Sequence, residues 1–408
     1  MDLREQRGLV IAATAKLKRQ GERWIVPSQS GHGIYAVSLD SADTRCSCPD
    51  WETRREKCKH IFAAMFVVRR EVYPDGKTVT ETLAITSETR VTYPQQWSAY
   101  NTAQTNEKHK FQSLLADLCR GLETPQVRKN GRPTLPMSDA LFSAIYKVYS
   151  TVSARRFMSD LRDAQARGYI AKTPHFNSVL NYLDKPELTP ILRNLITKSA
   201  MPLQSVETDF AVDSSGFMTS RFVRWFDVKY GKEQTKREWV KVHLMCGVKT
   251  NVVTAVEIGD KHASDLKFFP PLVEATARHF TVSEVSADKA YGGRVTTDAV
   301  HAVGGTPFIS FRGNATGKVG GTYEQMFHYF MFRKQEFLSH YHKRSNVEST
   351  FSMMKRKFGD SLRSKTDVAM VNESLCKILC HNLVVLIHEM LELGIDPVFW
   401  PQSPSSVV

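Results

Sequence analysis

The sequence predicts an α/β protein in which a mixed-sheet domain follows a helical region and a small ββα unit. Three observations lead to this prediction. Strand patterns, and then alternating strand and helix patterns, fill the chain from about residue 205 onward. Residues 136–200 carry helical periodicity. Near the N-terminus, two strand patterns precede a cluster of cysteines and a histidine.

The composition limits the class of protein and the partners that we expect for it. The 408 residues allow two or three domains, and 42% hydrophobic residues suffice for packed cores. A net charge of +13 favours polyanionic partners, because lysines and arginines release counterions from a phosphate backbone. No apolar run reaches the roughly 18 residues of a membrane span, and we recognise no signal peptide. We therefore expect no membrane partner.

The seven cysteines, an odd number, do not resemble a disulfide framework, so a reducing compartment is expected. Cys376 and Cys380, with His381 beside them, raise the question of a second metal site on one apparent helix. Buried free cysteines on an apolar helix face are common, and we favour that interpretation here.

Residues 1–92 form the first predicted unit. "RWIVPSQS" and "GIYAVSLD" predict a β-hairpin, and "KHIFAAMFVVRR" predicts an apolar helix. Between them stand Cys46-x-Cys48, nine further residues, and Cys58-x-His60. Three thiolates and an imidazole make a closed tetrahedral zinc site, with Cys46 and Cys48 expected at a hairpin tip and Cys58 and His60 at the start of the helix.

The alternative is that these four side chains pack as small buried groups without a metal. The charged residues between them make that unattractive, so one structural Zn²⁺ is expected. "CSCPDWETRREKCKHIFA" resembles a SWIM zinc finger, whose pattern is C-x-C, a variable spacer and C-x-H. The resemblance covers roughly residues 20–70 and implies binding of DNA or of a protein.

Residues 93–204 are predicted to be a linker followed by a helical DNA-binding region. In "PQVRKNGRPTLP", Arg128, Lys129 and Arg132 suit an extended basic segment along phosphates, and a solvated connector fits equally well. The arginine-rich helices of 136–200 suit a helix-turn-helix-like reader. A plain helical connector remains the alternative.

Residues 205–395 are predicted to be the mixed-sheet domain, and 396–408 a tail. "ETDFAVDSSGF" predicts a strand and turn, and two strand segments follow it, one at 221–231 and one split by a turn at "KTN". A helix is expected within 262–280, then a strand ending at Asp288, a helix near 293–302 and the strand "TPFIS". Helices complete the domain.

Three acidic residues stand out in this domain. Asp213 and Asp288 each end a predicted strand, where open α/β sheets bind ligands, and Glu348 lies on a basic helix. Three carboxylates suit two Mg²⁺ or Mn²⁺ ions, which catalyse phosphodiester cleavage. Singly, such aspartates are more often turn or cap residues. Asp209 competes with Asp213, because it shares the same face of the strand.

The segment "YHKRSNVESTFSMMKRK" strengthens the acidic set. Arg344 and Glu348 are four residues apart, and Lys355 follows Glu348 by two helical turns on the same face. A solvated basic helix with ion pairs between successive turns is the alternative. A lone glutamate among basic residues suits an acid in a phosphate-binding groove.

"VDSSGF", "SADKAYGG" and Y-x-x-R-x-x-x-E-x-x-x-x-x-x-K resemble the DDE transposases of bacterial insertion sequences, over about residues 205–390. "DKHASDLKFFPPL" also resembles their segment between the first two acids. The resemblance implies an RNase H-like fold and a metal-binding triad of Asp213, Asp288 and Glu348. It implies that Tyr341, Arg344 and Lys355 contact transposon-end DNA.

These patterns predict a transposase that cuts double-stranded DNA at transposon ends and joins the 3′-hydroxyl to target DNA. A homodimer on DNA and a cytoplasmic, bacterial nucleoid-associated location are expected. Sixty residues between Asp288 and Glu348 predict a compact domain without a large β-rich insertion. The alternatives are a domesticated DNA-binding protein without strand transfer and a structure-selective nuclease. The SWIM unit would recruit DNA or a host protein.

Overall fold

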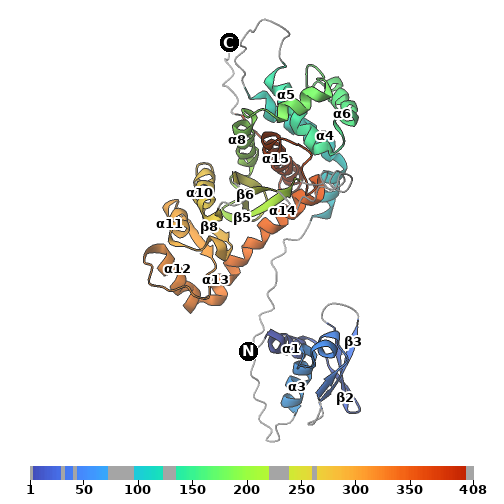
Figure 1. Ribbon diagram of the computed structural model, residues 1–408, viewed down its shortest axis with the longest axis vertical. Coiled ribbons are helices and arrows are strands. Elements are labelled where there is room, and N and C mark those ends of the chain that lie inside the picture. Colours follow the sequence, from blue (N-terminus) through green and yellow to red (C-terminus); the bar gives the residue numbers. More distant parts are fainter. Residues whose placement is uncertain are drawn as a thin grey trace, which may run out of the picture. The chain divides into compact units, whose positions relative to one another are not determined.

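The computed structural model describes residues 3–28, 33–39, 44–71, 96–122, 135–219, 239–259 and 264–400 (Figure 1). The chain divides into two compact units, residues 1–94 and 95–408. Each unit has its own hydrophobic core.

The first unit is a four-stranded antiparallel sheet with helices packed on it. Its elements are α1 (Leu3–Thr14), β1 (Lys18–Gln20), β2 (Arg23–Pro27), β3 (Ile34–Leu39), β4 (Thr44–Cys46), α2 (Pro49–Arg54) and α3 (Lys59–Glu71), and the strand order is β1-β2-β3-β4. The predicted hairpin is β2–β3. Gly8 lets α1 approach α3 closely, because a Cβ there would lie 2.5 Å from the Cβ of Phe62.

The second unit is built on a five-stranded mixed sheet in the order β7-β6-β5-β8-β9. Its strands are β5 (Asp209–Met218), β6 (Trp239–Gly247), β7 (Val253–Gly259), β8 (Glu284–Ala287) and β9 (Thr306–Ile309). β6 and β7 run antiparallel to their neighbours, whereas β8 and β9 continue parallel to β5. The predicted class, a mixed α/β sheet with helices and a Cys/His unit, is confirmed.

Helices cover both faces of this sheet. Cys246 of β6 contacts Thr350 of α14 (Ser345–Phe358). His243, three residues earlier and therefore on the opposite face, stacks on Phe268 of η2 (Asp265–Phe268), which leads into α10 (Phe269–Ala277). Along β5, Asp213 and Ser215 therefore face α14, and Ser214 faces η2 and α10.

The helical half of the second unit shares the core of the sheet. It consists of α4 (Trp97–Arg120), α5 (Met137–Ser150), α6 (Ala154–Ala166), α7 (Phe176–Leu183), α8 (Leu188–Ala200) and η1 (Met201–Leu203), packed around α15 (Asp367–Glu392). α15 is long and apolar enough to cross a membrane, but 89% of its most apolar window is buried inside the unit. Asn382 of α15 accepts from the N–H of Val253 at 2.8 Å and donates to its carbonyl at 2.7 Å, which satisfies the edge of β7.

The segment between β8 and α14 is short and mostly helical. It contains η3 (Lys289–Tyr291), α11 (Arg294–Ala302), β9, α12 (Gly321–Phe332), α13 (Lys334–Tyr341) and η4 (His342–Arg344). Within the described residues, β9 is the one strand in this segment, as expected for a domain without a β-rich insertion.

Two local predictions were wrong. "SSG" after Asp213 is not a turn, because Ser214, Ser215 and Gly216 continue β5 and pair with β6. Cys46 and Cys48 are not at a hairpin tip, since Cys46 ends β4 and Cys48 precedes α2. The basic residues Arg128, Lys129 and Arg132, and the strand predicted at 221–231, lie outside the described residues.

Candidate zinc and carboxylate sites

Four buried donor groups converge in the first unit. The thiol sulfurs of Cys46, Cys48 and Cys58 and a ring nitrogen of His60 all lie within 4.8 Å of one another. His60 Nδ1 is 3.9 Å from the sulfurs of both Cys46 and Cys58. These separations suit four ligands around one ion, with each donor about 2.0–2.3 Å from the metal.

The donors are positioned by the elements that flank them. Cys46 ends β4 and Cys48 precedes the first turn of α2, whereas Cys58 and His60 stand at the start of α3. The pKa of the Cys58 thiol is lowered, because hydrogen bonds from Cys46 and His60 stabilise its thiolate. Three thiols and an imidazole buried together, with a thiolate favoured among them, fit Zn²⁺.

Asp213 and Asp288 come together through strand register. β5 and β8 are parallel, and Val212 pairs with Ala287, so the two aspartates follow the same pair on adjacent strands. β8 ends there, whereas β5 continues beside β6. The two aspartates therefore lie side by side at the edge that β8 leaves open, close enough for the charge of Asp288 to act on the Asp213 carboxyl. The Asp213 carboxylate also accepts from the N–H of Ser214 at 2.8 Å.

Glu348 joins this edge from the first turn of α14. Its carboxylate accepts from Arg344 at 2.8 Å, and the same guanidinium nitrogen lies 3.8 Å from the Asp213 carboxylate. The side chain of Glu348 is 56% exposed, so it can move toward a ligand. Asp213 and Glu348 thus already share one cation, the guanidinium of Arg344.

The electrostatics of Asp213 indicate a site that attracts cations. Burial raises the pKa of its carboxyl, and the nearby charges of Asp288 and Glu348 raise it further, while the Ser214 N–H and Arg344 act in the opposite direction. Mutual repulsion among carboxylates is relieved when a cation binds between them. Three oxygen donors of this kind fit Mg²⁺ or Mn²⁺.

Asp209 is separated from this group. Its carboxylate accepts from Lys343 at 2.6 Å, and the same ammonium donates to Glu284 at 2.7 Å. Asp209 is therefore neutralised in a local ion-pair cluster, four residues before Asp213 on the same face of β5. The geometry favours Asp213 over its competitor.

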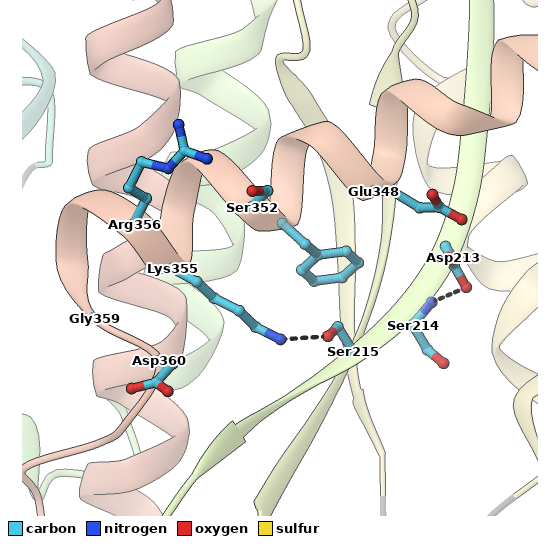
Figure 2. A pocket seen from close by; sticks show the side chains of 10 residues that line it. Asp213, Ser214, Ser215, Glu348, Ser352, Lys355, Arg356, Gly359 and Asp360 are labelled. Atoms are coloured by element: carbon cyan, nitrogen blue, oxygen red, sulfur yellow. Dashed lines mark hydrogen bonds between the residues drawn. The ribbon is translucent and has the colours of Figure 1, made fainter. Parts of the chain in front are cut away.

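A groove of about 690 Å³ extends from Asp213 and Glu348 along α14 (Figure 2). Lys355 projects into it and donates to the Ser215 hydroxyl of β5 at 2.7 Å. Burial lowers the pKa of Lys355. An ammonium that is partly withdrawn from water, with one hydroxyl partner, is well suited to contact an anion in the groove.

Tyr341 lies near this groove but not in its wall. It ends α13 and packs against the hydrophobic cluster of Phe308, Met326 and Phe337. Its ring lies 5.9 Å from the Arg344 guanidinium, and burial raises the pKa of its phenol. The structure therefore brings Tyr341, Arg344 and Lys355 to one side of the sheet edge, although only Lys355 lines the groove.

On the opposite face of β5, the structure shows a polar cluster that sequence reasoning missed, and this cluster supports the strand that carries Asp213. Asp265 accepts from Ser214 at 3.2 Å and pairs with Lys241. The buried His243 ring lies 4.0 Å from Asp265, and burial lowers its pKa to about 4. These residues are far apart in sequence, so only the sheet register brings them together. The presence of Asp265 in "HASDLKFF" was the available signal.

Two segments of the chain match known family models. Residues 204–383 match the model of the transposase DDE domain, and residues 35–68 match the SWIM zinc finger. The chain therefore carries a transposase DDE domain and an N-terminal SWIM zinc finger. The similarity to transposases is therefore one of this domain, and the similarity to zinc-binding modules is one of the N-terminal segment.

One solved structure similar to this chain is a cryo-EM structure of the piggyBac transposase synaptic complex with hairpin DNA. The match covers 74% of this chain and 77% of that one, at 10% identity and a TM-score of 0.34. A similarity this low supports no conclusion about function.

Proposed function

We propose that this protein is a DNA transposase that cleaves transposon ends and joins the freed 3′-hydroxyl to target DNA. The observation that carries the proposal is the convergence of Asp213, Asp288 and Glu348 at one sheet edge, within a transposase DDE domain. Asp213 and Asp288 are fixed by the sheet, and Glu348 is brought to them by α14.

Two divalent ions, Mg²⁺ or Mn²⁺, bound by these carboxylates would supply an activated nucleophile and stabilise the leaving oxygen of a phosphodiester. Water would be the nucleophile for cleavage, and the 3′-hydroxyl for joining. Within the chain, the carboxylates fix the position of the reacting phosphate, and the positive groups beside them neutralise its charge.

Arg344 has two roles in this proposal. Without DNA, its guanidinium neutralises Glu348 and lies close to Asp213. With Asp213 and Glu348 engaged by cations, the Arg344 guanidinium would be free to turn toward a phosphate. Lys355 provides a second phosphate contact from the groove, and Tyr341 holds the chain that carries Arg344.

Transposition requires two ends in one complex, so we expect at least a homodimer on double-stranded DNA. The SWIM zinc finger is a recognition module for DNA or for a protein. Arg128, Lys129 and Arg132 are proposed phosphate contacts on sequence grounds alone. A domesticated DNA-binding protein is the second candidate, and Glu348→Gln separates the two, since a protein that only binds would lose no function.

The experiment uses the full chain, Mg²⁺ and a labelled duplex carrying the ends of its own element. Metal-dependent cleavage that leaves a 3′-hydroxyl, lost in Glu348→Gln, supports the transposase. Cleavage without joined products indicates a nuclease. Tight DNA binding with no metal-dependent cleavage in the wild type overturns the proposal in favour of the domesticated protein.

A further inference from the structure

The groove beside the carboxylates extends along α14 beyond Asp213 and Glu348. Its lining begins at Asp213 and Glu348 and continues to Arg356 and Asp360 (Figure 2). Glu348, Ser352 and Arg356 are spaced by four residues, so they form one row along the exposed side of α14. Eight residues of helix cover about 12 Å. A strand of DNA advances roughly 3.4 Å per nucleotide along the duplex axis, so this length spans a few nucleotides.

The basic residues at the end of α14 differ in their partners. Lys357 is paired with the buried Glu107 at 2.5 Å, so its charge is used within the fold. Lys355 is fixed by Ser215. In the described part of the chain, no hydrogen bond or ion pair involves the Arg356 guanidinium, which lies exposed in the groove wall. Arg356 is therefore a cation that is available to bind a ligand, next to Lys355, whose position is fixed by Ser215.

The far end of the groove is held rigidly. Buried Lys377 donates to the carbonyls of Gly359 and Ser361 at 2.9 and 2.8 Å. Met218, which ends β5, donates to the Asp360 carbonyl at 2.9 Å and accepts from Leu362 at 2.8 Å. The loop after α14 is thus tied to both α15 and β5, and it forms a fixed wall.

We infer that this end of the groove is a binding subsite for the sugar-phosphate backbone of the DNA strand that flanks the scissile phosphate, with Arg356 and Ser352 as its unassigned contacts. The inference rests on the proposed function, which puts the scissile phosphate at the carboxylates. Arg356 contacts a phosphate, and the Ser352 hydroxyl donates to the same backbone. Ser215 acts as a positioning residue, because it fixes the Lys355 ammonium between the carboxylates and Arg356.

Asp360 limits the subsite. Its carboxylate lines the same end and would repel a phosphate placed next to it. The strand must therefore follow the α14 side of the groove, past Ser352 and Arg356, rather than the side of the loop. This path keeps the backbone over Lys355.

The test compares the wild type, Arg356→Ala and a matched control, Arg278→Ala. Arg278 is an exposed arginine after α10, on the other face of the sheet. Binding to a duplex carrying the element's end is measured by fluorescence anisotropy in Ca²⁺, over a range of salt concentrations. We expect Arg356→Ala to bind the duplex about fivefold more weakly than the wild type. The slope of the logarithm of its binding constant against the logarithm of salt concentration should be smaller in magnitude by about one. Arg278→Ala should match the wild type in both quantities.

A second arm uses duplexes cut back to the scissile bond from one side or the other. The difference in affinity between wild type and Arg356→Ala should vanish with one of the two shortened duplexes. The side removed from that duplex is the side of the scissile bond that Arg356 contacts. Equal binding by wild type and Arg356→Ala, or a difference that survives both truncations, overturns the inference. If the wild type binds through Arg356 but does not cleave in Mg²⁺, it is the transposase proposal that fails.

Discussion

The two candidate metal sites of this protein are opposites in construction. In the SWIM zinc finger, four donors lie within fifteen residues, and all four side chains are buried. In the DDE domain, the three carboxylates come from two strands and a helix spread over 136 residues, and Glu348 is mostly exposed. The closed site is suited to hold its ion permanently, and the open site to share its ions with a substrate.

The two sites also differ in the groups that their donor side chains contact when no metal is bound. The cysteines and the histidine contact one another, so we expect the fold of their unit to depend on an ion bound between them. Asp213 and Glu348 instead have an internal cation, Arg344, so we expect their unit to keep its fold without a metal. Metal removal should therefore affect stability in one unit and activity in the other.

The largest expected effect is the loss of zinc. Structural Zn²⁺ sites contribute on the order of 10 kcal/mol to folding, so a strong chelator should unfold the first unit and leave the second folded. Calorimetry of the full chain should show one transition lost and one unchanged. Returning Zn²⁺, but not Mg²⁺, should restore the lost transition. Retention of both transitions after complete zinc removal would contradict a structural zinc site.

The next effect concerns the carboxylates. Asp213→Asn removes the negative charge of a half-buried proposed metal ligand, and cleavage should fall on the order of a thousandfold while DNA affinity changes little. Asp209→Asn is the matched control, because Asp209 is held by Lys343 on the same face of the same strand. Its cleavage rate should stay within a few fold of wild type. Equal losses of cleavage rate in the two variants would contradict the assignment of Asp213, rather than Asp209, to the proposed metal site.

A smaller effect of opposite sign is expected at Arg344. Arg344→Ala removes the internal cation, so Mn²⁺ should bind the DNA-free protein about fivefold more tightly, as measured by titration calorimetry or electron paramagnetic resonance. Cleavage should nevertheless fall, because a phosphate contact is lost. Arg333→Ala, which alters an exposed arginine paired with Glu336, serves as control. Unchanged or weaker Mn²⁺ binding in Arg344→Ala would contradict the dual role.

The smallest effect is a pH-dependent change in stability within the second unit. Burial raises the pKa of Glu389 to about 7. Its charged form therefore opposes folding, and this penalty develops as pH rises from about 4.5 through 7. Glu389→Gln should stabilise the unit by about 1 kcal/mol at pH 8, allowing for partial exposure, and hardly at all at pH 4.5. A gain that is equal at both pH values would show that ionisation is not its cause.

The same contrast explains what the sequence could predict. The zinc donors are close in sequence, so their spacing alone indicates the site, although it did not reveal that Cys48 precedes a helix. Asp288 was predicted at a strand end, and β8 does end there. Asp213 was predicted at a strand end as well, but it lies within β5, because pairing with β6 continues after pairing with β8 stops.

Other features required the folded chain. The pairing of Ser214 with Asp265, and of Ser215 with Lys355, depends on which face of β5 each serine occupies. The spacing of Arg344 and Glu348 predicted their contact, but the approach of Arg344 to Asp213 depends on how α14 packs against the sheet. Contacts between residues one helical turn apart in sequence can be predicted from their spacing, whereas contacts between distant elements depend on strand register and packing.

The measurement that tests the account most directly is an analysis of reaction products. The full chain is incubated with Mg²⁺, a labelled duplex carrying the element's end and an unlabelled target, and products are separated on a denaturing gel. The account predicts strands with free 3′-hydroxyls followed by labelled strands joined to target, both absent in Asp213→Asn and in chelator. DNA binding without either product, or products that persist in Asp213→Asn, would contradict it.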